Sequence, residues 1–596
     1  MVEEMGPGVF EVEDGLDEDV WVGTPTLLEG ARPLSKSLLW RMHREYFERS
    51  GVEAWSQGEV PFSLTTGPIL AQRYARVIEG FVADCLAGRL GAVDPSEPLY
   101  IIELGAGSGR LAFMIMQLMD HAAIEPMKVV YVLTDLAQSN VEFFAHRKEL
   151  QRFAEQGRVD FARYEAGSDD PIHLEIAGID LVPGNVTNPM VGISNYLFCA
   201  MPQDLYSVLG EELREEHVAL FALDPSIKPN SREFLKQIVL CTAHAPVPEV
   251  RYDGGRIDRV LREAAKTRAG GKNRFVYPPY AIKSIESLLT LSGGRLCLLI
   301  GDRGPAQLPP VDDDEGPESQ SSAYTPGELF SMGIHGSSIS VPNDLDVISI
   351  AADDLGAELM RQPTPASQVV VAAILAGEQG EGSEARSEFN RVFGETSTDD
   401  LHLTVGRAVL AARGMDDAST LESIFATLRV SGYDPFTFVM LHPVLERLLP
   451  QAKEHQKDEL ERIVGRVYAL NYPFEEVSDI AFGLASILAQ AGRYEAALAH
   501  FAHSRADRGA RAPVSYDSAL CHLHLDQINE ALALLDEALE LDPEHERAKT
   551  LRDKVIAGER FDDEVEAQDV QVVPTSGTKT TGEGGFVRIR SPRTPN

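Results

Sequence analysis

Residues 99–110 read Leu-Tyr-Ile-Ile-Glu-Leu-Gly-Ala-Gly-Ser-Gly-Arg, and this stretch decides the fold. Its apolar first half is typical of a buried parallel strand, and the mostly apolar residues at 111–119 favour a buried helix. Glycine at every second position between them lets the chain turn sharply and lets a ligand approach the backbone, because glycine has no Cβ. The backbone N–H groups at the start of the helix would then face that ligand.

The spacing of the glycines narrows the class of ligand. A dinucleotide fingerprint would need its third glycine at Arg110, and a phosphate-binding P-loop would need a Gly-Lys-Ser/Thr sequence that does not follow. Glu103 followed by Gly105, Gly107 and Gly109 resembles motif I of the class I S-adenosylmethionine-dependent methyltransferases. The alternative is a strand–helix turn that binds no ligand.

Length, charge and cysteine usage limit the classes of protein to which this chain can belong. The 596 residues allow about three to four domains. Lysine and arginine number 54 against 92 acidic residues, and the net charge of −38 argues against nucleic acid as the main partner. The five cysteines are scattered without a Cys-x-x-Cys pair, which indicates a reducing compartment and predicts neither a metal site nor disulfides. We find no signal peptide and no apolar stretch long enough for a bilayer, so a cytoplasmic protein without a membrane partner is expected.

Polar residues end four apolar runs at nearly even intervals. Glu103, Asp135, Glu165 and Asn195 follow one another at steps of 32, 30 and 30 residues, and one β-α unit of a doubly wound sheet takes about thirty residues. Ligands bind at the strand ends of such sheets. Asp135 would accept hydrogen bonds from two ribose hydroxyls, and Glu165 would reach an adenine amino group. Glu103 would lie near the amine of the cofactor. Any one of these acids alone could be a solvated loop carboxylate.

The resemblance implies a fold and a cofactor. The fold is an α/β Rossmann-like methyltransferase domain with a mostly parallel seven-stranded sheet, and the cofactor is S-adenosylmethionine. The residues expected to bind it are Thr66, Glu103, Gly105, Ala106, Gly107, Gly109, Asp135, Leu136, Glu165, Ala166 and Asn195.

The rest of the first domain follows from periodicity. Helical patterns cover 35–49 and 70–85, and 295–302 resembles the fifth strand of these methyltransferases. Tyr277-Pro278-Pro279-Tyr280 is similar to the Asn/Asp-Pro-Pro-Tyr motif of amino-group DNA methyltransferases, but it begins with Tyr and precedes the fifth strand. We therefore expect it to be a rigid turn into a helix. The expected parts of the chain are a flexible acidic arm at 1–30, the methyltransferase domain at 31–378 with an insertion at 196–280, a helical repeat domain at 379–557 and a disordered tail at 558–596.

Within the superfamily, residues from about 60 to 378 resemble the MidA-type family, which includes the mitochondrial complex I assembly arginine methyltransferases. The resemblance is carried by Thr66-Gly67-Pro68-Ile69-Leu70-Ala71-Gln72, by Glu103 to Gly109, by Asn195-Tyr196-Leu197-Phe198-Cys199-Ala200-Met201-Pro202 and by Gly356 to Gln368.

Three positions depart from the family pattern. Its two acids after the fourth strand are here Tyr196 and Cys199, and its early Glu is Ile69. Carboxylates are what a guanidinium substrate needs, so their loss argues against arginine as the substrate. The catalytic candidates are Asn195 and Tyr196, which could accept from or orient an amine nucleophile. The alternative is that Tyr196 only packs.

From about residue 380 onward apolar residues recur at helical steps. Tyr494–Leu498 and Ile528–Leu532 are equivalent segments, and Ala497 precedes Ala531 by 34 residues, the tetratricopeptide period. Gly492 matches the turn glycine of that family, where the second copy has Asp526. We expect tetratricopeptide-like repeats at 478–545 that offer a surface to a protein or peptide. The alternative is a self-contained or dimerising module, which would give a homodimer.

These observations predict an S-adenosylmethionine-dependent methyltransferase whose repeats recruit a protein substrate. The main alternative is a catalytically silent methyltransferase-like scaffold, motivated by the altered segment Tyr196 to Cys199. A third interpretation is a small-molecule methyltransferase.

Overall fold

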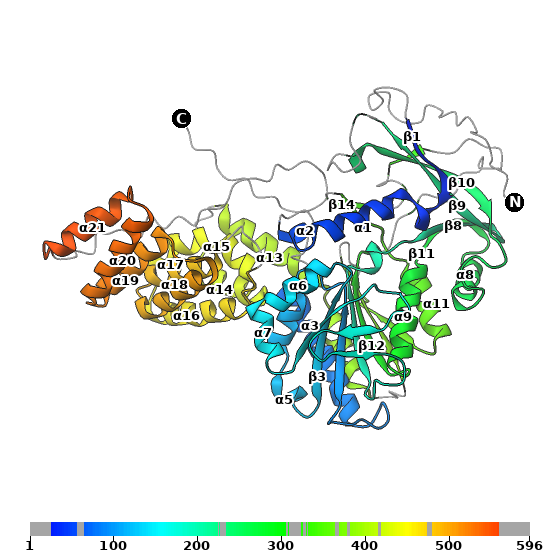
Figure 1. Cartoon of the computed structure of the whole chain (residues 1–596), viewed down its shortest axis with the longest axis horizontal. Helices are drawn as coiled ribbons and strands as arrows, with labels where there is room; N and C mark the ends of the chain where they lie inside the picture. The colour runs from blue at the N-terminus through cyan, green and yellow to red at the C-terminus, as the bar shows by residue number, and fades with distance from the viewer. Residues whose placement is uncertain are drawn as a thin grey trace. The chain divides into compact units, whose positions relative to one another are not determined.

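The computed structural model describes residues 26–56, 65–223, 226, 234–304, 308, 323–325, 329, 332–335, 337–363, 369–377, 382–414, 419–473 and 479–559. The chain divides into two compact units, residues 1–403 and 404–596, and each is described by itself (Figure 1). Among the described residues, no helix is long and apolar enough to cross a membrane.

A seven-stranded sheet forms the centre of the first unit. Its order is β16-β17-β12-β7-β2-β3-β4. The five strands from β12 to β4 run parallel, whereas β17 is antiparallel to β12 and β16 is antiparallel to β17. This confirms the predicted Rossmann-like methyltransferase fold. The strands are β2 (Pro98–Leu104), β3 (Lys128–Asp135), β4 (Val159–Arg163), β7 (Met190–Asn195), β12 (Leu296–Asp302), β16 (Glu358–Arg361) and β17 (Val370–Ala376).

Helices cover both faces of this sheet (Figure 1). On one face, α9 (Pro279–Leu291) and α11 (Leu345–Asp354) share a core with the strands. On the other face lie α3 (Pro68–Leu86) and α4 (Arg110–Leu118). Pro279 is the first residue of α9, where a missing N–H costs nothing, so the Tyr-Pro-Pro-Tyr segment is a turn into a helix. The smaller elements are α5 (His121–Ile124), α6 (Gln138–His146), α7 (Lys148–Ala154), β5 (Ile172–Leu174) and β6 (Ile179–Leu181).

The insertion after β7 builds a second, antiparallel sheet. Its order is β11-β8-β9-β10-β13, and β1 pairs with β9. Residues 26–30, expected in the acidic arm, therefore lie in a strand, because Thr26 to Pro33 hydrogen-bond along β9. Residues 1–25 of that arm lie outside the described residues. The elements are β1 (Thr26–Pro33), η2 (Leu34–Lys36), η3 (Phe198–Ala200), β8 (Asp204–Gly210), β9 (Glu212–Ala222), η4 (Phe234–Gln237), β10 (Ile238–Pro246), α8 (Arg256–Lys266), β11 (Gly271–Tyr277), β13 (Ala323–Tyr324), β14 (Gly333–His335) and β15 (Ser338–Ser340).

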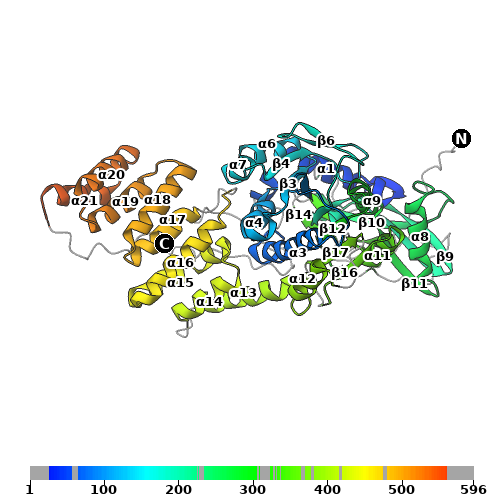
Figure 2. The same ribbon diagram turned by 90° about the horizontal axis from the view of Figure 1, so that it is seen from below.

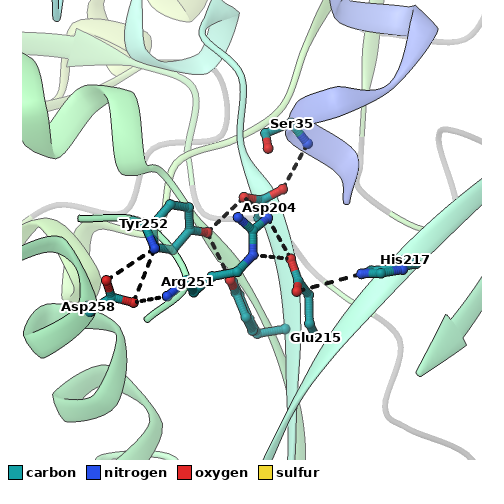
Figure 3. A network of polar contacts seen from close by, with 8 residues as sticks. Ser35, Asp204, Glu215, His217, Arg251, Tyr252 and Asp258 are labelled. Carbon is teal, nitrogen blue, oxygen red and sulfur yellow. Dashed lines mark hydrogen bonds and ion pairs between the residues drawn. The ribbon is translucent and has the colours of Figure 1, made fainter. Parts of the chain in front are cut away.

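A buried polar network fixes the start of the N-terminal helices to this second sheet (Figure 3). Asp204, at the start of β8, accepts hydrogen bonds from the Ser35 N–H (2.8 Å) and the Tyr252 hydroxyl (2.7 Å). Arg251 donates to Asp204 and, through Nε, to Glu215 at 2.7 Å. Two carboxylates thus neutralise one buried guanidinium, and their removal would leave its charge unpaired. The network anchors Ser35, which lies directly before α1 (Leu38–Ser50), and α2 (Glu53–Ser56) follows α1.

The first unit extends beyond the boundary expected at residue 378. Helix α12 (Glu384–Phe393) packs on α3, where a Cβ on Gly80 would lie 2.8 Å from the Glu384 carbonyl oxygen. Asp84, fully buried in α3, accepts hydrogen bonds from the N–H groups of Glu384 (2.8 Å) and Ala385 (3.0 Å). The carboxylate therefore caps the N-terminus of α12, and the unit ends at Leu403.

The second unit is a stack of antiparallel helices. Side chains from α13 to α19 share one core cluster, and α19 to α21 share another. Figure 2 shows α17 to α20 following one another in chain order. Gly492 (φ +75°) and Asp526 (φ +58°) take the same left-handed turn conformation 34 residues apart. The helices are α13 (Thr398–Arg413), α14 (Leu421–Val430), α15 (Pro435–Leu448), η5 (Leu449–Gln451), α16 (Glu454–Ala469), α17 (Ile480–Gln490), α18 (Tyr494–Arg508), α19 (Ala512–His524), α20 (Ile528–Leu541) and α21 (Glu546–Ile556).

Candidate ligand-binding site

The glycine turn after β2 needs its glycines for two reasons. Gly105, Gly107 and Gly109 have φ values of +65°, +59° and +75°, a conformation in which a side chain is strained. A Cβ on Gly107 would also lie 2.8 Å from the Trp55 ring, and one on Gly105 would lie 3.0 Å from Leu197. Residues 106–109 of the turn are buried, and the side chains of Trp55 and Leu197 cover two of its glycines.

Asp135, the last residue of β3, holds this turn in place. Its Oδ2 accepts a hydrogen bond from the Gly107 N–H at 3.0 Å, and its Oδ1 accepts one from the Ala137 N–H at 2.9 Å. Burial raises the pKa of Asp135, and these hydrogen bonds partly oppose that shift. The Asn140 side chain and the Leu136 backbone also hydrogen-bond this carboxylate. Its capacity of about four hydrogen bonds is therefore in use, and a ligand hydroxyl would have to replace one of these donors.

A cavity of about 300 Å³ opens at the carboxyl ends of the parallel strands, a volume at the lower end of ordinary small-molecule sites. Its wall is aromatic and aliphatic, with Asp135 and Glu165 at its rim. The lining residues are Trp40, His43, Arg44, Phe47, Trp55, Gly105, Asp135, Leu136, Tyr164, Glu165, Ala166, Tyr196, Leu197, Ala200, Met201, Pro202 and Tyr280.

Half of the residues expected at the site line this cavity. The lining includes Gly105, Asp135, Leu136, Glu165, Ala166 and Tyr196, and it does not include Thr66, Glu103, Ala106, Gly107, Gly109 or Asn195. The sequence analysis missed the wall formed by α1 and α2. Trp40 and Phe47 are seven residues apart and so share one face of α1, a signal that shows a helix face but not what it faces.

Glu165 lies two residues beyond β4 and pairs with α1. Its two carboxylate oxygens accept hydrogen bonds from Nη1 (2.5 Å) and Nη2 (3.0 Å) of Arg44. Both side chains are nearly half exposed, so the pair contributes about 0–1 kcal/mol to stability. It nonetheless holds the carboxylate at the cavity rim, beside the aromatic wall.

Glu103 is buried behind the glycine turn rather than in the cavity wall. Its Oε2 accepts a hydrogen bond from the Tyr131 hydroxyl at 3.0 Å. Burial raises the pKa of Glu103 to about 8, a shift that the Tyr131 hydrogen bond opposes and the Asp135 charge increases. At neutral pH this carboxyl is therefore mainly protonated, and a nearby cation would favour its ionised form.

The segment after β7 contains both catalytic candidates. Tyr196 lines the cavity and adopts φ +56°, an uncommon conformation for a residue with a side chain. The Asn195 side chain is turned away from the cavity, and its Nδ2 donates to the Thr65 carbonyl oxygen at 2.6 Å. Burial raises the pKa of Tyr196, so its phenol is neutral at ordinary pH.

Cys199 lies below the cavity floor and belongs to a closed polar cluster. Asp302, at the end of β12, accepts hydrogen bonds from the Cys199 N–H (3.0 Å) and from Nδ2 of Asn343 (2.9 Å). Burial raises the pKa of Asp302 to about 6 and that of Cys199 well above its ordinary range. The thiol is therefore unreactive, and the cluster ties η3 to the segment after β15.

His43 faces the cavity but is not a general base. Its Nδ1 accepts a hydrogen bond from the Ile339 N–H at 3.2 Å. Burial lowers the pKa of His43 to about 4, although a hydrogen bond with the Ala200 backbone raises it. Because Nδ1 is occupied, this neutral ring supports the wall of the cavity and offers no free basic nitrogen there.

Comparison with known proteins identifies repeats in the second unit. Residues 488–555 match the family model of the tetratricopeptide repeat. No curated protein matches the sequence.

Solved structures show only weak likenesses. A protein from Burkholderia thailandensis bound to S-adenosyl-homocysteine aligns at 15% identity over 60% of this chain and 90% of its own, with a TM-score of 0.36. The complex of DhpI with S-adenosyl-homocysteine aligns at 10% identity over 57% and 97%, with a TM-score of 0.23. YrrB, a tetratricopeptide repeat protein with an unusual peptide-binding site, aligns at 18% identity over 28% and 80%, with a TM-score of 0.21. These scores are too low to support a functional assignment.

Glu103 should make the stability of the first unit depend on pH. Its pKa is raised from 4.5 to about 8, so the folded chain keeps a proton that the unfolded chain loses. The stability from this group is complete below pH 4.5 and is lost as pH rises toward 8, by up to about 1.4 kcal/mol per pH unit. Urea unfolding followed by tryptophan fluorescence reports on this unit, because the three tryptophans of the chain are at positions 21, 40 and 55 and the unit spans residues 1–403.

Glu103→Gln should abolish the fall in unfolding free energy between about pH 6.5 and 8. Asp302 is already mostly ionised in this pH range, so it contributes little to the fall. An unchanged slope in the variant would contradict the assignment to Glu103.

Proposed function

We propose that the chain is an S-adenosylmethionine-dependent methyltransferase. The observation that carries the proposal is the cavity at the carboxyl ends of β2, β3 and β4, bounded by Gly105, Asp135 and Glu165. Ligands of doubly wound sheets bind at this edge, close to where the strand order reverses between β2 and β7. The glycines carry no side chain that would separate a ligand from the turn, so the residues present fit a nucleoside-bearing ligand.

Each group of the cofactor has a matching group on the protein. Asp135 would accept from the ribose hydroxyls, Glu165 would accept from the adenine amino group, and the aromatic wall would pack on the base. Leu136 and Ala166 would line the base pocket, while Thr66, Ala106 and Gly109 would shape the turn. When bound, S-adenosylmethionine supplies an activated methyl group.

The remaining residues would position the nucleophile and exclude water. The neutral hydroxyl of Tyr196 could hydrogen-bond an amine at the cavity wall, and Asn195 would hold the segment before α3 through Thr65. Among the residues that the structure describes, Asp135 and Glu165 are the carboxylates of the lining, and so small a set disfavours a guanidinium substrate.

We further propose that the substrate is a protein and that the tetratricopeptide repeats recruit it. Stacked helical repeats create extended surfaces that suit peptide or protein partners. The proposed site of action is the cytoplasm. A repeat-mediated homodimer is the competing role for this unit.

A catalytically silent scaffold is the second candidate, and a specific contact favours it. In this structure the Trp55 ring lies on Gly107, and the Cys199 segment is tied down by Asp302 and Asn343. A protein that binds the cofactor without transferring its methyl group would need no opening toward a substrate.

Binding of S-adenosyl-homocysteine tests the site directly. We expect it to change the fluorescence of Trp40 and Trp55, which line the cavity. Glu165→Gln should weaken binding about tenfold, because a charged acceptor is replaced by a neutral amide oxygen, whose hydrogen bond to the ligand is about half as strong. Glu48→Gln is the matched control, because Glu48 also pairs with Arg44 and does not line the cavity. Equal affinities of both variants and the unaltered chain would contradict the proposed role of Glu165.

Transfer is tested separately from binding. The full chain, incubated with methyl-labelled S-adenosylmethionine and cell extract, should label protein, and Tyr196→Phe should lower the rate at least about tenfold without changing cofactor affinity. Binding with no labelled protein or small molecule would favour the scaffold. If the labelled methyl group appeared only in small molecules, the proposal of a protein substrate would be wrong.

A further inference from the structure

Two buried oxygen atoms beside Gly301 of β12 lack a hydrogen-bond partner among the described residues. One is the hydroxyl of Tyr74 in α3, and the other is Oδ1 of Asn195 at the end of β7. Tyr74 is fully buried and Asn195 is 9% exposed. Both oxygens converge on Gly301 of β12, because a Cβ at that glycine would overlap each of them. The glycine thus leaves room for two polar atoms that bond to nothing described.

The orientation of the Asn195 amide is fixed. Its Nδ2 donates to the Thr65 carbonyl oxygen, which can only accept, so Oδ1 must point to the side of Tyr74 and Gly301. Unpaired buried polar groups destabilise a fold, and phenylalanine would fill the place of Tyr74 without that cost. Two such atoms side by side therefore indicate that a ligand supplies their hydrogen-bond donors when it is bound.

The sheet register places a third oxygen group on the same side. Asn195 pairs with Gly301, and Glu103 pairs with Ile193, two residues before Asn195. Side chains alternate along a strand, so Glu103 and Asn195 point to the face of the sheet that α3 covers. Glu103 and the Tyr74 hydroxyl are close enough to interact electrostatically.

We propose that Tyr74 and Asn195 form, together with Glu103, the seat for the ammonium group at the amino-acid end of the ligand. This inference rests on the proposed function. An ammonium group donates three hydrogen bonds and needs three acceptors, and these side chains offer an amide oxygen, a hydroxyl oxygen and a carboxylate. The seat lies behind the cavity, so the amino-acid end would reach it by displacing the Trp55 ring from Gly107.

The test measures the affinities of two ligands for the chain with and without the Tyr74 hydroxyl. S-adenosyl-homocysteine has an amino-acid end, whereas 5′-methylthioadenosine has the same nucleoside without it. Tyr74→Phe should weaken S-adenosyl-homocysteine binding about tenfold and leave 5′-methylthioadenosine binding unchanged. The free variant should be as stable as the unaltered chain or more stable, because an unpaired buried hydroxyl is removed.

Tyr206→Phe is the matched control in the second sheet. Its hydroxyl is equally buried but contacts the Tyr252 hydroxyl at 2.8 Å, so this variant should lose stability and keep both affinities. The proposed ammonium site would be wrong if Tyr74→Phe left the affinity for S-adenosyl-homocysteine unchanged, or if it lowered the affinities for both ligands equally. Either result would leave the proposed function unaffected. Failure of the unaltered chain to bind either ligand would overturn both.

Discussion

The hydrogen bond from the Gly107 N–H to Asp135 Oδ2 is the contact on which the candidate site depends. It joins the turn after β2 to the end of β3, so the neighbouring strands and the turn form one rigid edge. The turn can approach Asp135 only because its glycines adopt positive φ without strain. The same carboxylate lines the cavity. A single interaction thereby shapes the turn and presents the acceptor, and each proposed ligand contact builds on it.

The two halves of the site differ in how open they are. On one side, the cavity is lined by α1, Asp135 and Glu165, and the side chain of Glu165 is 48% exposed. On the side of Tyr196, the segment to Gln203 is held by contacts of Asp302 and Asn343, and Gln203 itself donates to the Phe198 and Val341 carbonyl oxygens. Binding and transfer therefore impose separate demands on this chain. Cofactor binding requires the edge formed by the glycine turn and the strand ends. Methyl transfer requires Tyr196 and its neighbours to admit a nucleophile.

Local pattern predicted the central sheet well, because parallel strands are continuous apolar runs and their ends carry the polar residues. The second sheet was not predicted. Four of the first five residues of strand β9 are charged (Glu212, Arg214, Glu215 and Glu216), and the burial of Glu216 depends on Arg274 in β11, 58 residues away. The placement of α12 depends in the same way on Asp84, 299 residues before Ser383. The aromatic wall was missed because periodicity shows that Trp40 and Phe47 share a face without showing what that face covers. The unpaired oxygens at Gly301 leave no trace in the sequence.

The central claim is that the edge formed by the glycine turn and Asp135 binds the adenosine part of S-adenosylmethionine. A crystal structure of the full chain grown with saturating S-adenosyl-homocysteine tests this most directly. The account predicts the nucleoside in the cavity lined by Gly105, Asp135 and Glu165, with both ribose hydroxyls within hydrogen-bond distance of Asp135. The claim would be contradicted by a structure in which the ligand is bound elsewhere. It would also be contradicted by one in which the cavity holds no ligand and the Asp135 carboxylate keeps its present contacts.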